Sequence, residues 1–253
     1  SGPCSTSSIN GYGCVVSSIA CFSRVTWLYL MKNKNEVFVV FKNFHAFTTT
    51  QTCSKLKWPR IDNRKEYINS QITVFCAKNW IKWELTTPNN PTSNGVTEQY
   101  NRTLCERVGC TLSTSNLPNA FRGEASQTAL HIINQCPHDS LRGGITEDIW
   151  SGKSTLYDHL HIFGCEAFVH IRQELRNKLD AKSIECIFWG YSVEGEMGYR
   201  IYLHHPRKVI RSCDVFNEAK LLKSNCTSLE STKRMKFQQQ STIDSRIISQ
   251  GDE

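Results

Sequence analysis

The chain has 253 residues, 39% of them hydrophobic, with a formal net charge of +7 and a pI near 8.8. This length and apolar fraction suffice for one domain of about 150 residues and a smaller second one, and they exclude a wholly disordered protein. The excess of Lys and Arg over Asp and Glu favours a polyanionic partner, although many proteins carry such an excess for solubility alone. Because no signal peptide and no apolar stretch of transmembrane length is present, we expect a nuclear or cytoplasmic protein that is not secreted and has no membrane partner.

The first predicted elements are a hairpin and a helix. Residues 12–21 and 24–31 are rich in β-branched and aromatic side chains and predict two strands, with a turn at 22–23. Apolar residues then recur at helical spacing and predict an amphipathic helix over 33–48.

The next elements lead to an acidic residue. Residues 55–62 predict a short strand that ends at Asp62. An acid at the carboxyl end of a strand, where the sheet opens to solvent, is where a metal site is expected. The sequence then predicts further helices and one edge strand, namely a helix over 66–79, a strand over 81–86, a helix from about Asn94, and a helix over 118–135 that stops before Pro137.

The C-terminal half has a different character. Five short strands punctuated by Gly and Pro predict a small all-β barrel over 159–218. Residues 219–253 carry too little apolar content to fold and predict a disordered, flexible tail. The predicted organisation is therefore an α/β core over 1–138, a linker over 139–158, the barrel and the tail.

Twelve cysteines are spread along the chain, and no two have the Cys-x-x-Cys spacing of a zinc site. Most lie in apolar segments, so we interpret them as small buried hydrophobic residues in a reducing compartment.

Two acids carry the functional signal. Thirty-five residues separate Asp62 from Glu98, and each acid lies in a distinctive polar run. The runs are Asp62-Asn63-Arg64-Lys65-Glu66 and Asn94-Gly95-Val96-Thr97-Glu98-Gln99-Tyr100-Asn101-Arg102. In this pattern the chain resembles the integrase of copia-type retrotransposon polyproteins, where these acids are the second and third of the catalytic core. Further matching runs are Phe163-Gly164-Cys165, Lys178-Leu179-Asp180, Gly190-Tyr191-Ser192 and Gly198-Tyr199-Arg200.

The resemblance covers about residues 1–218 and implies a fold. It implies a ribonuclease-H-like core, a mixed five-stranded sheet with flanking helices, followed by the family's small barrel. In the family, the central first strand and the first catalytic Asp come before the position of Ser1, and no Asp precedes Asp62 here. We therefore expect the first strand to be missing and the 253-residue polypeptide to be poorly stable, or to recruit another segment into the gap.

The resemblance also implies the chemistry. Integrases join DNA with two divalent ions roughly 4 Å apart, which activate the attacking hydroxyl and stabilise the leaving oxygen. Asp62 and Glu98 would be catalytic metal ligands, yet two acids could hold only one hydrated magnesium or manganese ion weakly. We expect little or no catalysis from this chain. The implied partners are the element ends and chromosomal target DNA, with homo-oligomers in the intact family and no small-molecule substrate.

Four further residues are candidates for DNA binding. Arg102 matches a family position that faces DNA phosphates, although an ion pair with Glu98 one turn earlier would also explain it. Arg64 and Lys65 stand where the family has two glycines. Their positive charges would oppose the binding of a divalent ion at Asp62. Alternatively, the two side chains could contact a DNA phosphate. Asn94 is expected to cap its helix, and the resemblance places it at the rim of the active site.

Two other functions remain open. The chain could be a non-enzymatic DNA-binding or assembly module that relies on the barrel and the basic surface. It could instead be a retrotransposon relic without function.

Overall fold

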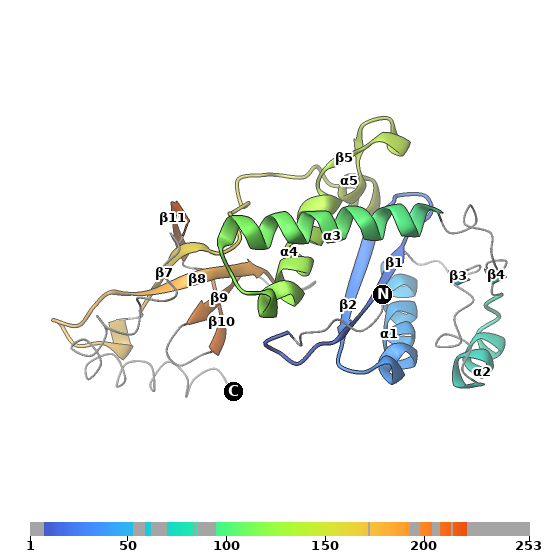
Figure 1. Cartoon of the computed structure of the whole chain (residues 1–253), viewed down its shortest axis with the longest axis horizontal. Helices are drawn as coiled ribbons and strands as arrows, with labels where there is room; N and C mark the ends of the chain where they lie inside the picture. The colour runs from blue at the N-terminus through green and yellow to red at the C-terminus, as the bar shows by residue number, and fades with distance from the viewer. Residues whose placement is uncertain are drawn as a thin grey trace.

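The structure is a computed structural model that describes residues 8–52, 59–61, 70–82, 84–85, 95–171, 173–192, 198–203, 208–213 and 215–221. Figure 1 shows helices and small sheets in the N-terminal part and a larger antiparallel sheet in the C-terminal part, so the predicted mixed α/β fold is confirmed. No helix in the described ranges is long and apolar enough to cross a membrane.

The predicted hairpin and first helix are both present. Strands β1 (Cys14–Ile19) and β2 (Thr26–Met31) pair antiparallel, with Ile19 opposite Thr26. After the short 3-10 helix η1 (Lys34–Glu36), helix α1 (Val37–Thr52) runs four residues beyond the expected end at 48. Its last turns are rich in threonine hydroxyls that donate to carbonyl oxygens one turn earlier, which keeps those side chains compatible with the helix.

A parallel pair of very short strands follows. Strand β3 (Arg60–Ile61) pairs with β4 (Glu84–Leu85), and helix α2 (Ser70–Lys78) lies between them in sequence. Among the described residues no strand joins this pair to the β1–β2 hairpin. The β1–β2 hairpin and the β3–β4 pair are therefore two separate sheets in the described part of the chain.

Two helices connect the N-terminal part to the C-terminal sheet. Helix α3 (Gly95–Ser115) is followed by the 3-10 helix η3 (Asn119–Phe121) and helix α4 (Arg122–Asn134), close to the predicted bounds. Leu104 of α3, Leu28 of β2 and Ala129 of α4 share one buried cluster. Helix α4 therefore packs against both α3 and the hairpin.

The segment predicted as a linker contains regular structure. Strands β5 (Pro137–His138) and β6 (Gly144–Ile145) pair antiparallel around the 3-10 helix η4 (Asp139–Leu141), and helix α5 (Thr146–Ser151) follows. The ring of Trp150 on α5 lies edge-on to that of Trp27 on β2, with centroids 4.9 Å apart. This contact ties α5 to the hairpin.

The C-terminal sheet has five antiparallel strands in the order β10-β9-β8-β7-β11. The strands are β7 (Cys165–His170), β8 (Ser183–Tyr191), β9 (Tyr199–Leu203), β10 (Lys208–Ser212) and β11 (Val215–Leu221), and the 3-10 helix η5 (Gln173–Leu175) lies between β7 and β8.

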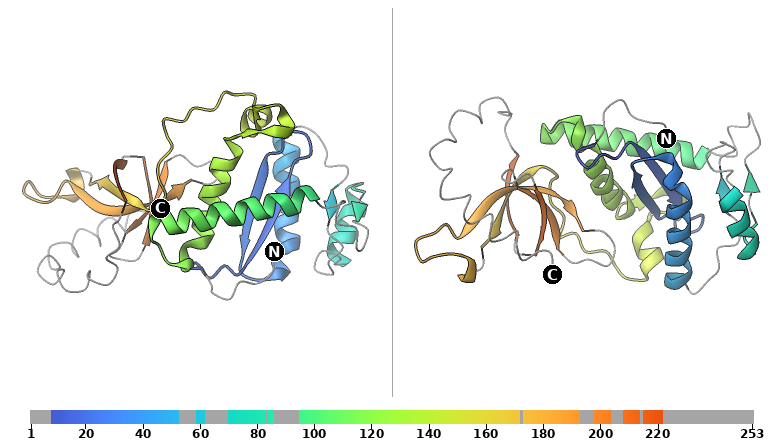
Figure 2. Two further views of the ribbon diagram at one scale, coloured as in Figure 1. Left: turned by 45° about the horizontal axis from the view of Figure 1, so that its top comes forward. Right: turned by 90° about the horizontal axis from the view of Figure 1, so that it is seen from below.

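This sheet must be curved. Strands β10 and β11 lie at opposite edges, yet only residues 213 and 214 separate them in sequence. The three steps from Ser212 to Val215 span at most about 11 Å, whereas four flat strand spacings would require about 19 Å. The edges therefore come close together, which supports the predicted small barrel, and Figure 2 shows the strong bend of the strands. Residues 222–253 lie outside the described ranges, so the flexible tail stays a prediction.

Helix α4 and helix η3 cover one face of this sheet. Trp189 of β8 is fully buried, and its ring centroid lies 4.6 Å from that of Phe121 and 4.5 Å from that of Tyr202. Gly190 has φ +135°, and a Cβ added there would lie 2.6 Å from Oγ1 of Thr128 on α4. The close approach of the sheet to α4 therefore depends on a glycine at this position.

Candidate functional site on helix α3

Glu98 and Arg102 lie on the solvent-facing side of helix α3. Glu98 is in the first turn of the helix, where an acid interacts favourably with the helix dipole, and Arg102 follows one turn later. Both residues are exposed. Because residues four apart share a face of a helix, the two side chains project to the same side, as predicted.

The opposite side of α3 is fixed by packing. Leu104 is 6% exposed and contacts the core, and at about 100° per residue Glu98 and Arg102 lie roughly 120° and 160° around the helix from it. Ser17 Oγ of β1 donates to Oδ1 of Asn101 at 3.3 Å. Burial raises the pKa of Tyr100 to about 12. These contacts orient the N-terminal half of α3 and leave Glu98 and Arg102 towards solvent.

The alternative explanation of Arg102 was an ion pair with Glu98. No such pair joins the two side chains in the described part of the chain. The guanidinium of Arg102 is therefore not held by the carboxylate one turn before it.

The remaining predicted site residues, namely Asp62, Arg64, Lys65 and Asn94, lie outside the described residues. Strand β3 ends at Ile61, the last described residue before Asp62. The separation of Asp62 from Glu98 stays a prediction.

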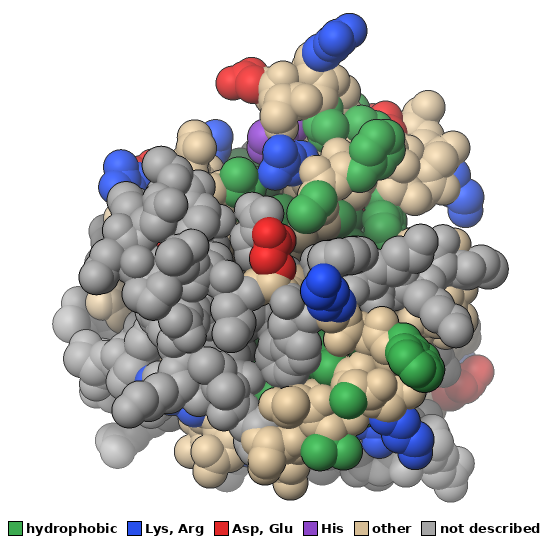
Figure 3. Space-filling model, turned by 90° about the vertical axis from the view of Figure 1, so that its right-hand side faces the viewer, with side chains coloured by type: hydrophobic (Ala, Val, Ile, Leu, Met, Phe, Trp, Pro, Cys, Tyr) green, Lys and Arg blue, Asp and Glu red, His purple; other side chains and the backbone are tan. Residues whose placement is uncertain are grey.

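The described residues do not by themselves fit a divalent metal ion. Within the described ranges, no three His, Cys, Asp or Glu side chains come together as a possible metal site. Glu98 is the one predicted metal ligand in those ranges, and one carboxylate is too few oxygens for magnesium. Figure 3 shows acidic and basic side chains scattered singly over the face around α2 and the start of α3, beside surface that belongs to residues outside the described ranges.

Comparison with known proteins gives the family. The chain is 44% identical over 221 residues to the retrovirus-related Pol polyprotein from transposon TNT 1-94 of Nicotiana tabacum, a match that covers 87% of this chain. The chain is related to the Pol polyproteins of copia-type retrotransposons. It is also 28% identical over 197 residues to the Pol polyprotein from transposon RE1 of Arabidopsis thaliana. This copia-type segment spans only 17% and 13% of the lengths of these two relatives.

Two further comparisons concern the parts of this copia-type segment. Residues 165–230 match the family described as retroviral polymerase SH3-like domain, and this range begins at β7 and includes all five strands of the C-terminal sheet. Among solved structures, the catalytic core domain of HTLV-2 integrase in complex with magnesium is similar, with a TM-score of 0.42 and 19% identity over 54% of this chain and 84% of that domain. The BIV integrase core is similar with a TM-score of 0.41 and 17% identity, over the same shares of the two chains.

One polar cluster of this copia-type segment was missed by sequence reasoning. Glu124 of α4 forms an ion pair with Arg200 of β9, with 2.6 Å between Oε2 and Nη1, although 75 residues lie between them. Their side chains are only 5% and 15% exposed, respectively. The sequence analysis noted Arg200 only as part of a family run, and no local pattern pointed to Glu124.

Proposed function

We propose that this chain is the integrase-derived part of a copia-type Pol polyprotein, whose ancestral role is metal-dependent DNA strand transfer. Glu98 and Asp62 would be the metal ligands supplied by these residues, and Arg102 would contact a DNA phosphate. The observation that carries the proposal is the common solvent-facing side of Glu98 and Arg102, at motif positions of a chain 44% identical to such a polyprotein. DNA is the proposed partner, and we also propose that the chain associates with further copies of itself.

The proposed contact of Arg102 with phosphate is supported by its surroundings. Its guanidinium is exposed and is not paired with Glu98 among the described residues. A guanidinium can donate two parallel hydrogen bonds to a phosphate, which fixes a DNA backbone more firmly than a point charge does.

We further propose that the polypeptide of residues 1–253 does not catalyse strand transfer alone. A two-ion site needs a bridging carboxylate, and no Asp precedes Asp62 within these residues. Arg64 and Lys65 add positive charge beside the proposed ligand, which opposes the binding of a divalent cation.

A second candidate is a DNA-binding or assembly module that works without catalysis. It is favoured by the net charge of +7 and by the SH3-like match at residues 165–230, neither of which depends on the acids. A relic without function is the third candidate, and absence of the protein from cells would support it.

The test combines DNA joining with DNA binding. The purified polypeptide is incubated with labelled oligonucleotides and magnesium or manganese, with and without chelator, and its DNA affinity is measured over a series of salt concentrations. We expect no joining, but salt-dependent binding that persists in Asp62→Asn and Glu98→Gln. Chelator-sensitive joining would refute the proposed inactivity, and an absence of salt-dependent binding would refute the DNA-binding role.

A matched pair of variants tests Arg102. Arg102→Gln should weaken binding about equally for all sequences and lower the slope of log affinity against log salt by about 1. Arg107→Gln is the control, because Arg107 is also exposed on α3 but lies about 140° around the helix from Arg102. Equal effects of the two substitutions would contradict a specific contact.

A further inference from the structure

Three histidines, the imidazole cluster, gather where the C-terminal end of helix α4 meets the sheet. His131 comes from α4, and His159 and His161 come from the segment that leads into β7. The ring centroid of His131 lies 4.1 Å from that of Tyr191 in β8, in a stacked arrangement, and 5.7 Å from that of His159. None of these residues belongs to α3, so the cluster is separate from the Glu98 face.

The side-chain amide of Gln135 lies between two of these rings. Its Nε2 is 3.1 Å from Nε2 of His131, one turn earlier on α4, and 3.5 Å from Nε2 of His159. Because an amide nitrogen only donates, both ring nitrogens accept, so both rings are neutral and carry their hydrogen on Nδ1. Gln135 is 8% exposed, and its Oε1 has no hydrogen-bond partner among the described residues. A buried acceptor without a partner is costly, so the amide gains when a donor reaches Oε1.

Further hydrogen bonds attach the cluster to the sheet. The backbone N–H of His161 donates to Oη of Tyr191 at 2.9 Å, and this Oη donates to the carbonyl oxygen of His161 at 3.1 Å. Nε2 of His161 lies 3.2 Å from Oη of Tyr199 in β9. Oη of Tyr157 donates to the carbonyl oxygen of Gln135 at 3.0 Å. The cluster therefore joins the end of α4 to two strands of the sheet.

The imidazole cluster is poorly suited to hold positive charge. Burial, followed by the neighbouring His159, lowers the pKa of His131 to about 4, and the same two causes lower the pKa of His161. No Asp or Glu in the described ranges forms a hydrogen bond or an ion pair with any of the three rings. Protonated rings of His131 and His159, with centroids 5.7 Å apart, would therefore repel each other without a counter-charge in contact.

The ionisable groups that the sheet turns towards the cluster are tyrosines and cysteines. Burial raises the pKa of Tyr191 to about 12 and that of Cys165 to about 11, and it also raises the pKa of Tyr199. Cys213, near Tyr199, is exposed. The buried groups of this set stay neutral in acid, so they provide no negative charge for an imidazolium.

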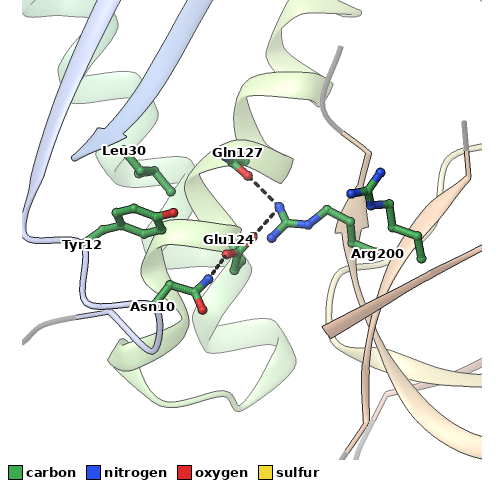
Figure 4. Close-up of a pocket in the computed structure, with 7 residues that line it drawn as sticks. Asn10, Tyr12, Leu30, Glu124, Gln127 and Arg200 are labelled. Atoms are coloured by element: carbon green, nitrogen blue, oxygen red, sulfur yellow. Dashed lines mark hydrogen bonds and ion pairs between the residues drawn. The ribbon is translucent and has the colours of Figure 1, made fainter. Parts of the chain in front are cut away.

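The nearest charged groups are engaged elsewhere or lie in solvent. Glu124 is on the same side of α4, but it lies seven residues, or about 10 Å, before His131. Figure 4 shows its carboxylate in contact with Asn10 and Arg200, which occupy its two oxygens. Asp158, in the segment before β7, is exposed, so solvent screens its charge.

We propose that the imidazole cluster is a pH-sensitive contact, which holds α4 against the sheet at neutral pH and releases it in mild acid. The first proton comes from solvent and binds Nε2 of His131 or His159. Rotation of the Gln135 amide by half a turn then exchanges its nitrogen for Oε1, which accepts the new N–H. A second proton would place two imidazolium rings around one neutral oxygen, and their repulsion separates α4 from segment 157–161. The proposal does not depend on the proposed function.

The experiment uses the full chain and three substitutions. Gln135→Glu places a carboxylate between the two rings, His159→Gln removes one of the two charges but keeps a polar side chain, and His170→Gln removes an exposed histidine of β7 outside the cluster. Thermal unfolding at neutral pH checks that each variant folds. From neutral pH down to pH 4, NMR follows the histidine rings and the Gln135 amide. Hydrogen exchange, corrected for its intrinsic pH dependence, measures the protection of α4 and of segment 157–161.

In the wild type, we expect protection of segment 157–161 and of the end of α4 to fall before that of the rest of the chain, at pH below 6.5. The Gln135 amide signal should shift together with the ring signal of His131. Gln135→Glu should raise the midpoint of the His131 titration by about one pH unit or more, because a carboxylate stabilises an imidazolium, and should keep protection to lower pH. His159→Gln should also keep protection to lower pH, because only one charge then arises, and His170→Gln should match the wild type.

Protection of the wild type that does not change down to pH 4 would overturn the proposal. Loss of protection at the same pH in the wild type, Gln135→Glu and His159→Gln would overturn it as well. An effect of His170→Gln as large as that of His159→Gln would refute the cluster as the source of the pH dependence. If one cluster variant does not fold, the titration of the wild type and the other variant still decide.

Discussion

Trp80 occupies a backbone conformation that suits glycine. Helix α2 ends with a turn in which N–H of Ile81 donates to the carbonyl oxygen of Cys76 at 2.9 Å, and between them Trp80 has φ +57°. This left-handed position after a helix is usually a glycine, because a Cβ there crowds the following carbonyl. The Trp80 side chain is 89% exposed, whereas Ile81 is buried and fixes the turn.

We therefore predict that Trp80→Gly is more stable than Trp80→Ala. Both substitutions lose the same indole, and only alanine keeps the Cβ. Relief of the left-handed strain is worth about 1–2 kcal/mol, and the extra freedom of glycine in the unfolded chain offsets about 0.4–1 kcal/mol of it. The net difference is then roughly 0.5–1 kcal/mol, or a melting temperature a few degrees higher in a chain of this size.

The assay is urea unfolding of the wild type and both variants, followed by circular dichroism. Because the free energy of unfolding falls linearly with urea, a higher midpoint at unchanged slope reports a gain in native-state stability. Hydrogen exchange at Ile81 reports the same turn locally. An alanine variant as stable as the glycine variant would show that the position carries no strain and would refute the reasoning.

Three further predictions follow from the junction between α4 and the sheet. Gly190→Ala should lower the free energy of unfolding by more than about 2 kcal/mol, because its Cβ would lie 2.6 Å from Oγ1 of Thr128. Thr128→Ala should restore part of that loss. A small effect of Gly190→Ala in urea unfolding would contradict the close approach of the sheet to α4. Glu124→Gln should lower the free energy of unfolding by about 3–5 kcal/mol, because it leaves Arg200 buried without its counter-charge. A double-mutant cycle with Arg200→Met should then show strong coupling between the two residues. Additive effects of the two substitutions would argue against the ion pair. Burial lowers the pKa of His131 from 6.5 to about 4, so the unfolded chain binds more protons than the folded chain between these values. The stabilisation is fully present above pH 6.5 and is lost as the pH falls to about 4. His131→Phe should flatten this part of the curve of stability against pH. An unchanged curve would exclude His131 as the source of the pH dependence.

The sequence predicted the elements whose signals are local. The helical spacing of apolar residues placed α1 and α4 to within a few residues, and the predicted helix from about Asn94 put Glu98 and Arg102 on one face. The short elements between residues 137 and 151 were missed, because two-residue strands and a six-residue helix have too few positions to form a periodic pattern.

Contacts between distant segments could not be predicted from one sequence. The pairing of Glu124 with Arg200 depends on how α4 packs against β9. The sequence of neither segment indicates that the other is its partner. The same holds for the order of the five strands, in which consecutive β10 and β11 lie at opposite edges. The arrangement of Asp62 relative to Glu98 also depends on such long-range packing, and it stays a prediction.

The two-residue connection between β10 and β11 has a consequence for self-association. Open sheet edges are templates on which neighbouring molecules add strands, and a curved sheet whose edges are tethered together presents little straight edge to a second copy. A longer insertion after Ser212 would release this tether and allow the sheet to flatten. Such an insertion would thereby create the exposed edges from which fibrous aggregates grow, without changing any residue of the sheet itself.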